Sequence, residues 1–339
     1  MTRLLAIVGR LVQAVPTVFG ILVITFLLTR ALPGDPAAFF AGPAATPDSI
    51  AEIRSQLGLD KPLPIQFAKY LGDLTDGNLG QSISTGQPVL SELARRLPAS
   101  LELTLFALVI SVSVALPLGV LAALHQDRWI DQLCRFIVTA GVSLPTFFTG
   151  LILVYVFYFL LGIAPTPLGR IDIIALPPPH VTGFYLIDGI LAREWATTWS
   201  ALKQLALPAT TLALFTLAPL ARMTRASMLQ ALGSEYIRTA RACGLSKMKI
   251  LVGYALRNAM LPVVTTLGMV FSFSLGANVL VEKVFSWPGI GSFAIEALVV
   301  SDYAAVQGFV LAMALLFVVL NLIVDLLYTV IDPRVKLDG

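Results

Sequence analysis

The sequence predicts an all-α protein that crosses a membrane several times. Of its 339 residues, 57% are hydrophobic and only 13% are charged, about half the charge of an ordinary soluble domain. The mean hydropathy is +0.85. The apolar residues also form six long runs, each close to the length with which a helix crosses a bilayer. These runs, taken as transmembrane helices, are 11–29, 101–124, 136–163, 204–220, 259–281 and 305–331.

The first run follows a basic start that contains Arg3 and Arg10. A secretory signal peptide has the same order of charge and apolar residues, but its apolar core is only about 7–15 residues long. The run at 11–29 has 19 residues, and further spans follow it. We therefore predict that residues 1–31 form an uncleaved first transmembrane helix.

The chain then becomes polar, and residues 32–97 predict a small external domain of helices. Thr46 can cap a helix whose first residue is Pro47, and Gly58 can end it. A second short helix is predicted at 64–74. An unspecialised loop is the alternative, but a connection of this length without structure of its own is uncommon.

The distribution of charge predicts the orientation of the remaining transmembrane domain, residues 98–331. If the amino end is inside, the cytoplasmic segments are 1–10, 125–135, 221–258 and 332–339. Lys and Arg are nearly threefold denser in these segments than in the outer ones. Because cytoplasmic loops carry the excess of basic residues, both termini are predicted to be cytoplasmic, with 332–339 as a tail.

Several kinds of chemistry are missing from the sequence. It contains no Gly-x-x-x-x-Gly-Lys-Ser/Thr phosphate loop, no Gly-x-Ser-x-Gly and no His-Glu-x-x-His motif. Cys134 and Cys243 lie far apart, as do His125 and His180, so neither a disulfide framework nor a His-based metal site is expected. We predict no catalytic residue, no metal, no cofactor and no nucleic-acid partner.

The most informative stretch is a basic island between the fourth and fifth apolar runs. Residues that share a narrow apolar stripe, within about 80° on a helical wheel, are Leu229, Leu232, Tyr236, Ala240 and Cys243. Gly244 stands where a helix needs a left-handed closing residue, and a second helical run covers 246–257. The stretch predicts a helix–glycine–helix reversal with an apolar ridge that can dock on another protein.

Two blocks of this stretch carry a resemblance to a known family. They are E-Y-I-R-T-A-R-A-C-G-L, which begins at Glu235, and A-L-R-N-A-M-L-P-V-V-T, which begins at Ala255. They resemble the cytoplasmic coupling loop of bacterial ABC importer permeases of the dipeptide/oligopeptide/nickel branch, DppB-like dipeptide permease subunits in particular. The resemblance extends from Pro33-Gly34-Asp35-Pro36 to Asp332-Pro333-Arg334 and includes Phe285-Ser286-Trp287-Pro288-Gly289.

The loop departs from the family pattern at three points. Arg238 and Thr239 stand where Glu and Ala are expected, Cys243 stands where this branch often has Lys, and Leu261-Pro262 falls late. An ordinary loop whose basic residues only follow the positive-inside rule is the alternative. By resemblance, residues 229–258 form the coupling loop, and its ATPase-coupling residues are Leu232, Glu235, Tyr236, Arg238, Thr239, Ala240, Arg241, Cys243 and Gly244.

The resemblance implies a non-hydrolytic permease subunit of the bacterial inner membrane. Its implied partners are a second homologous permease subunit in a heterodimer, two ATP-binding subunits, and a periplasmic or lipid-anchored peptide-binding protein. Short peptides, dipeptides foremost, are the implied substrates, while relatives carry nickel, glutathione, haem or sugars. A self-sufficient secondary carrier is the alternative from another class, but its inverted repeats and mid-membrane charges are not found.

One acidic residue, Asp325, lies inside the last apolar run, about 9 Å from its cytoplasmic end at 1.5 Å per residue. An unpaired carboxylate within a span is unfavourable. The basic residues at matching depth are Arg222 and Arg225, and we predict an ion pair between Asp325 and one of them. Interfacial water, or a bond to Asn321, is the alternative.

Overall fold

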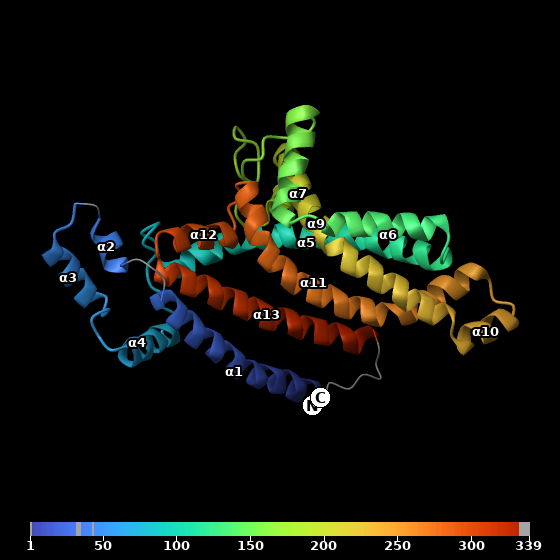
Figure 1. Cartoon of the computed structure of the whole chain (residues 1–339), viewed down its shortest axis with the longest axis horizontal. Coiled ribbons are helices and arrows are strands. Elements are labelled where there is room, and N and C mark those ends of the chain that lie inside the picture. The colour runs from blue at the N-terminus through green and yellow to red at the C-terminus, as the bar shows by residue number, and fades with distance from the viewer. Residues whose placement is uncertain (1, 32–34, 43, 332–339) are drawn as a thin grey trace. The chain divides into compact units, whose positions relative to one another are not determined.

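The computed structural model of the chain is built from helices (Figure 1). It describes residues 2–31, 35–42 and 44–331, without the side chains of 2–8, 10, 11, 36, 39, 40 and 325–331. The helices are α1 (Thr2–Ala31), α2 (Pro36–Ala41), α3 (Pro47–Gln56), α4 (Leu63–Thr75), α5 (Val89–Leu124), α6 (Trp129–Val142), α7 (Thr146–Leu153), α8 (Tyr185–Leu191), α9 (Trp195–Leu232), α10 (Glu235–Ala242), α11 (Arg257–Val284), α12 (Ile290–Val299) and α13 (Tyr303–Ile331). Two π-helical segments, η1 (Val154–Leu160) and η2 (Lys249–Leu256), complete the order. The prediction of an all-α protein is confirmed.

Five helices of the described chain are long and apolar enough to cross a membrane, and a bent pair brings the number to six. The five are Val12–Ala31, Val89–Leu124, Trp195–Leu232, Lys249–Val284 and Tyr303–Val324. The pair is Trp129–Val142 with Thr146–Leu160, bent by 99°. Six predicted spans thus correspond to six apolar segments, although the third is not the continuous helix 136–163 that the sequence predicts.

The bend falls at residues 143–145, next to Pro145. Proline disfavours the helical conformation of the residue before it and lacks the N–H that would continue the ladder. The fourth predicted span differs as well. Helix α9 begins nine residues before the predicted start of this span at Gln204 and ends twelve residues after its predicted end at Leu220. Apolar runs mark the part of a helix that suits the bilayer, and helices continue past them into polar sequence.

The chain divides into two compact units, and two of the three boundaries fall inside long helices, α5 and α13. Unit 1 comprises Met1–Ser100 and Pro288–Val318, and unit 2 comprises Leu101–Trp287 and Val319–Gly339. The predicted tail, 332–339, lies outside the described residues.

Unit 1 contains the short helices predicted after the first span. Thr46 caps α3 by accepting a hydrogen bond from the N–H of Ser49, and Gly58 follows the helix with φ +70°. Helix α4 covers the second predicted segment and packs on α1, where the rings of Phe26 and Phe67 lie 5.0 Å apart, edge to face.

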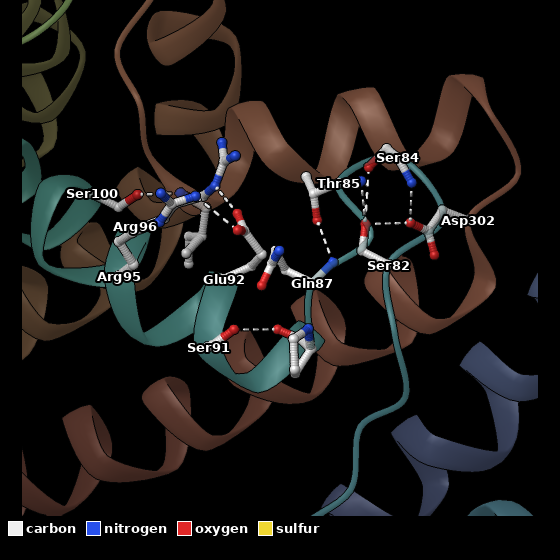
Figure 2. A network of polar contacts seen from close by, with 12 residues as sticks. Ser82, Ser84, Thr85, Gln87, Ser91, Glu92, Arg95, Arg96, Ser100 and Asp302 are labelled. Carbon is white, nitrogen blue, oxygen red and sulfur yellow. Dashed lines mark hydrogen bonds and ion pairs between the residues drawn. The ribbon is translucent and has the colours of Figure 1, made fainter.

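A buried carboxylate ties two loops of unit 1 together (Figure 2). One oxygen of Asp302 accepts hydrogen bonds from the hydroxyl of Ser82 (2.7 Å) and from the N–H groups of Ile83 (2.7 Å) and Ser84 (3.3 Å). Its other oxygen accepts from the N–H of Ala305. The side chain of Asp302 is fully buried, so this cage fixes residues 82–84 against the start of α13.

The core of unit 2 lies around α9, which packs against α6, α7, α8 and α11. Its members are Leu108, Ala115, Val138, Leu217, Ala218, Leu220, Ala221 and Val270. Helices α5 and α9 approach closely at Gly119, where an added Cβ would lie 2.5 Å from the Cβ of Thr224 and 2.9 Å from the carbonyl oxygen of Ala221. No side chain fits at this position without displacing one of the two helices.

Candidate functional site

The predicted helix–glycine–helix reversal is formed by α10 and its flanking turns. Helix α9 ends at Leu232, and Gly233 and Ser234 lead into α10 after a gap of only two residues. Glu235 lies in the first turn of α10 and Arg241 in the last. Both charges suit the helix dipole, which favours acids at the amino end and bases at the carboxyl end.

Gly244 ends α10 as the sequence predicts. Its φ is +75°, a conformation open to glycine at little cost. The N–H of Gly244 donates to the carbonyl of Arg241 (3.0 Å), and the N–H of Leu245 donates to that of Ala240 (3.2 Å). This is a Schellman closure, which reverses the chain toward η2.

The loop is held by an apolar cluster from five elements of unit 2, namely α5, α9, α10, η2 and α11. Its buried members are Ala123, Met228, Ala231, Ile237, Ala240, Ile250, Ala255 and Ala259. Met228 and Ile237 are completely buried. Because the ends of α5, α9 and α11 beside the loop all contribute, α10 lies against its own chain along one face.

The predicted docking ridge therefore needs a correction. Ala240 is only 6% exposed and belongs to this internal cluster, so it is not available to another protein. Ile237, which the wheel analysis omitted, is the anchor of the buried face. The exposed face of α10 contains Tyr236, Thr239 and Cys243, which follow one another at helical spacings of three and four. We call these three residues the outer face of α10.

The charged residues of the loop are at its surface. Glu235 and Arg238 form an ion pair of 2.9 Å with side chains 83% and 72% exposed. Arg241 and Gly244 are exposed too, whereas Leu232 is half-buried beside the apolar cluster. After the reversal, Met248 and Val252 expose 67% and 53% of their surface. The loop thus presents apolar and charged groups together, as partner-binding surfaces do.

A buried ion pair fixes the helix that enters the loop. Arg225 of α9 binds Asp131 of α6 through two parallel contacts, Nε to Oδ1 at 2.8 Å and an NH2 group to Oδ2 at 2.7 Å. Asp131 is fully buried and also receives Arg135 at 3.2 Å. The side chain of Asp325 lies outside the described residues, so its pairing with Arg222 or Arg225 stays a prediction. The sequence did not suggest Asp131 as a partner of Arg225.

A second buried ion pair organises residues 164–203 of unit 2, which we call the outer loop after its predicted side of the membrane. Arg170 binds Glu102 of α5, and the two side chains are 6% and 5% exposed. Arg170 also donates to the carbonyl of Gly183 at 2.8 Å and lies over the ring of Tyr185 at 3.6 Å. Glu102 accepts in turn from the N–H of Leu186. Glu102 and Arg170 lie 68 residues apart, so nothing in the local sequence around either residue indicates the pair.

Asp188 provides the other fixed point of the outer loop. It accepts hydrogen bonds from the hydroxyl and N–H of Thr182 (2.7 and 2.8 Å) and from the N–H groups of Val181 and Gly183 (3.3 and 2.9 Å). Burial by itself raises the pKa of Asp188, but these hydrogen bonds outweigh it and hold the pKa below its usual value. The carboxylate therefore stays charged and keeps residues 181–188 folded.

Within the described part of the chain, no group of three or more His, Cys, Asp or Glu side chains is placed to hold a metal ion. The features that stand out are instead the long apolar helices and an exposed loop held at their ends. Such an arrangement suits a membrane component that receives movement from a partner.

Comparison with known proteins identifies this kind of component. The model of the family described as "Binding-protein-dependent transport system inner membrane component" matches residues 115–337. The chain belongs to this family. A second model, for the amino-terminal part of such membrane components, matches residues 1–104. The family consists of transport permeases of the ABC type and not of enzymes.

Relatives from several bacteria match nearly the whole chain. The probable D,D-dipeptide transport system permease protein DdpB of Escherichia coli is 45% identical over 322 residues, which are 95% of this chain and 94% of the relative. The di/tripeptide permease DppB of Pseudomonas aeruginosa is 42% identical, with coverage of 97% and 98%. The dipeptide permease DppB of Alkalihalophilus pseudofirmus is 39% identical, with coverage of 96% and 98%.

Proposed function

We propose that this family member is the permease subunit of an ATP-driven importer of short peptides, dipeptides foremost, in a bacterial inner membrane. The observation that supports it best is the near full-length similarity to permeases whose names specify dipeptides, D,D-dipeptides and di/tripeptides. The same machinery for nickel, glutathione, haem or a sugar is the alternative. The chain itself hydrolyses no ATP.

In this proposal, the 229–258 loop receives the movement of a separate ATP-binding subunit. The outer face of α10 (Tyr236, Thr239 and Cys243) is the contact, with the Glu235–Arg238 pair beside it. The buried face, anchored by Ile237, passes the movement to α9 and α11 through the apolar cluster. Two ATP-binding subunits, a homologous permease in a heterodimer and a periplasmic or lipid-anchored peptide-binding protein complete the machine.

The proposed topology places both termini and the 229–258 loop in the cytoplasm. Residues 32–97 and the outer loop 164–203 are then periplasmic. The density of basic residues supports this orientation. Labelling of single introduced cysteines with an impermeant reagent tests it: positions 50–70 should react from outside intact spheroplasts, and position 247 should not. Protection at 50–70 would contradict the orientation.

We also keep the proposed ion pair of Asp325 with Arg222 or Arg225. Since Arg225 is already engaged by Asp131, Arg222 is the better partner. Charge exchange tests it: Asp325→Arg should impair transport, and adding Arg222→Asp should restore part of it. The pair is rejected if Asp325→Asn transports normally and no exchange rescues Asp325→Arg.

Uptake of labelled dipeptide tests the proposed function itself. Cells that lack their own dipeptide permeases should regain uptake when they express this chain with its transporter subunits. Unlabelled dipeptide should compete, whereas nickel, glutathione and haem should not. Competition by one of those solutes alone would overturn the peptide assignment and retain the permease.

A pair of matched variants tests the coupling contact. Thr239→Glu adds a charge on the outer face of α10, and Gln126→Glu adds the same charge to an exposed position of another predicted cytoplasmic segment. Because an unpaired charge at an interface is unfavourable, we expect Thr239→Glu to lower uptake about tenfold or more and to release the ATP-binding subunits on purification. Equal behaviour of the two variants would reject the contact.

A further inference from the structure

Unit 1 encloses a cavity of about 570 Å³ that the proposed function does not use. It lies among the end of α1, the turn after α3, helix α4, residues 78–83 and the start of α13. The volume is within the range of about 300–1,000 Å³ that is usual for sites of small molecules. Apolar walls are provided by Leu57, Leu59, Ile65, Leu79, Ile83 and Tyr303.

One side of the cavity carries an arginine without a carboxylate partner among the described residues. The contacts of Arg30 are a long hydrogen bond to Gln66 (3.4 Å), one to the hydroxyl of Thr29 (3.2 Å), and the rings of Phe26 and Tyr303 at 3.8 and 5.5 Å. These groups position the guanidinium and leave its charge unpaired. A planar guanidinium in such a setting is suited to a carboxylate.

An acidic side chain, opposite in charge to Arg30, also lines the cavity. Asp73, in the last turns of α4, takes part in none of the ion pairs found in the described part of the chain. Asp302 also borders the cavity, but its oxygens already accept hydrogen bonds from Ser82 and Ser84 (Figure 2). They also accept from the N–H groups of Ile83 and Ala305. Asp73 is therefore the acid that remains for a cation.

Further polar groups can complete the site. The hydroxyl of Tyr70 is buried and has no hydrogen-bond partner among the described residues. Burial raises the pKa of Tyr70 to about 12, although the charge of Arg30 opposes this, so the hydroxyl keeps its proton as a donor. Gln307 offers its amide oxygen, and the exposed Lys61 and Lys69 add positive charge at the rim. The amide of Gln66 is already engaged by Arg30 and by the carbonyls of Leu59 and Lys61.

We propose that this cavity binds a small zwitterion, namely a free dipeptide or a peptide of similar size. Its carboxylate would bind Arg30, its ammonium group would face Asp73, and the apolar walls would take a side chain. The site belongs to unit 1 alone and is additional to any path through the transmembrane helices. Because the site would bind both the carboxylate and the ammonium group of the dipeptide, it would distinguish the dipeptide from a simple anion.

Calorimetric titration of the full-length chain in nanodiscs, without any binding protein, tests the proposal. The probes are alanyl-alanine, N-acetyl-alanyl-alanine, which keeps only the carboxylate, and alanyl-alaninamide, which keeps only the ammonium group. The variants are Arg30→Gln and Asp73→Asn. Matched controls are Arg95→Gln, an exposed and paired arginine of unit 1, and Asp76→Asn, three residues beyond Asp73 and outside the cavity.

We expect Arg30→Gln to weaken binding of alanyl-alanine and of the acetylated probe at least tenfold, with less than a twofold change for the amide. Asp73→Asn should weaken alanyl-alanine and the amide and leave the acetylated probe unchanged. Both controls should bind as wild type does.

Three results would overturn the inference: no saturable binding by the wild-type chain, wild-type binding of all three probes by both variants, or losses in the controls as large as those in the variants. Arg30→Gln could instead lose docking of the peptide-binding protein while it still binds dipeptide. That result would also overturn the inference, because the group that Arg30 binds would then be an acidic side chain of that protein. Normal dipeptide uptake alongside any of these results would reject this cavity as the site and leave the proposed function standing.

Discussion

The outer loop 164–203 and the inner loop 229–258 of unit 2 are held in opposite ways. The outer loop is fixed by buried charges, Arg170 on Glu102 and the caged carboxylate of Asp188. The inner loop is fixed by the apolar anchor Ile237 and the glycine turn at Gly244, with its charges left in solvent. Buried charges impose one geometry because any other leaves them unpaired. An apolar anchor imposes no such pairing, which suits the coupling role that we propose for this loop.

The largest effect should come from the outer ion pair. Glu102→Ala leaves the charge of Arg170 buried without a partner, and we expect a loss of about 3–5 kcal/mol in stability. Limited proteolysis of the purified chain in detergent should then cut within residues 164–203. The double variant Glu102→Met with Arg170→Met should recover most of the loss, because two apolar side chains can replace a buried pair. Equal proteolysis of single and double variants would contradict this account.

The apolar anchor of the inner loop should come next. Ile237→Ala creates a cavity under α10, with an expected cost of about 3 kcal/mol. Hydrogen exchange should then increase across 229–258, and ATP-driven uptake should fall. Tyr236→Ala is the matched variant on the exposed side: it should lower uptake while exchange in the loop stays as in wild type. If both variants change exchange equally, the two faces of α10 are not distinct.

The cage of Asp188 predicts a pH dependence confined to the outer loop. Since the pKa of Asp188 is lowered in the folded chain, its contribution is complete above the unfolded value of about 3.9 and is lost as pH falls through the folded one. Asp188→Asn should cost about 1–3 kcal/mol at neutral pH and remove this acid sensitivity. Proteolysis of 164–203 as a function of pH measures both. An unchanged acid transition in Asp188→Asn would assign it to other groups.

A smaller loss is expected at the glycine turn. Gly244→Ala forces a Cβ into the left-handed conformation at φ +75°, with an expected cost of about 1 kcal/mol. Gly253→Ala is the control in the same loop, because its Cβ would enter open space and its φ is not positive. Thermal unfolding should separate the two. A lower melting temperature for Gly253→Ala than for Gly244→Ala would show that the left-handed turn is not the cause of the lost stability.

The smallest effect belongs to the exposed pair of the inner loop. Arg238→Ala should change stability by no more than about 0.5 kcal/mol, because both partners are largely in solvent. A measurable drop in uptake without a change in melting temperature would then assign Arg238 to the contact with the ATP-binding subunit. A drop in both would show that the pair is structural and would weaken the contrast between the two loops.

Sequence patterns predicted the local features of the chain better than its long-range contacts. The cap at Thr46, the turn at Gly58 and the closure at Gly244 are set by neighbouring residues, and the structure has all three. The apolar runs predicted the helices that can span a membrane, though Pro145 divides the third.

Contacts between distant residues were beyond such patterns. Asp131 and Arg225 are 94 residues apart, and Glu102 and Arg170 are 68 apart, so nothing local indicates either pair. The wheel analysis of α10 assigned Ala240 to a docking ridge because a periodic stripe does not say which protein it faces. Ile237, one position beside that stripe, determines the buried side, and only its packing on Met228 and Ala255 reveals this.

The close approach of α5 and α9 at Gly119 has a mechanical consequence. Helix α9 cannot turn about its axis without driving Thr224 into the backbone of α5, and Arg225, one residue further, ties α9 to α6. These contacts hold α5, α6 and α9 to one another where α9 enters the loop. The second arm of the loop is different, because it continues through the π-helical η2 straight into α11. In the proposed coupling role, a movement of α10 would therefore reach α11 directly along the backbone of η2, and would reach α9 through the short turn at Gly233 and Ser234.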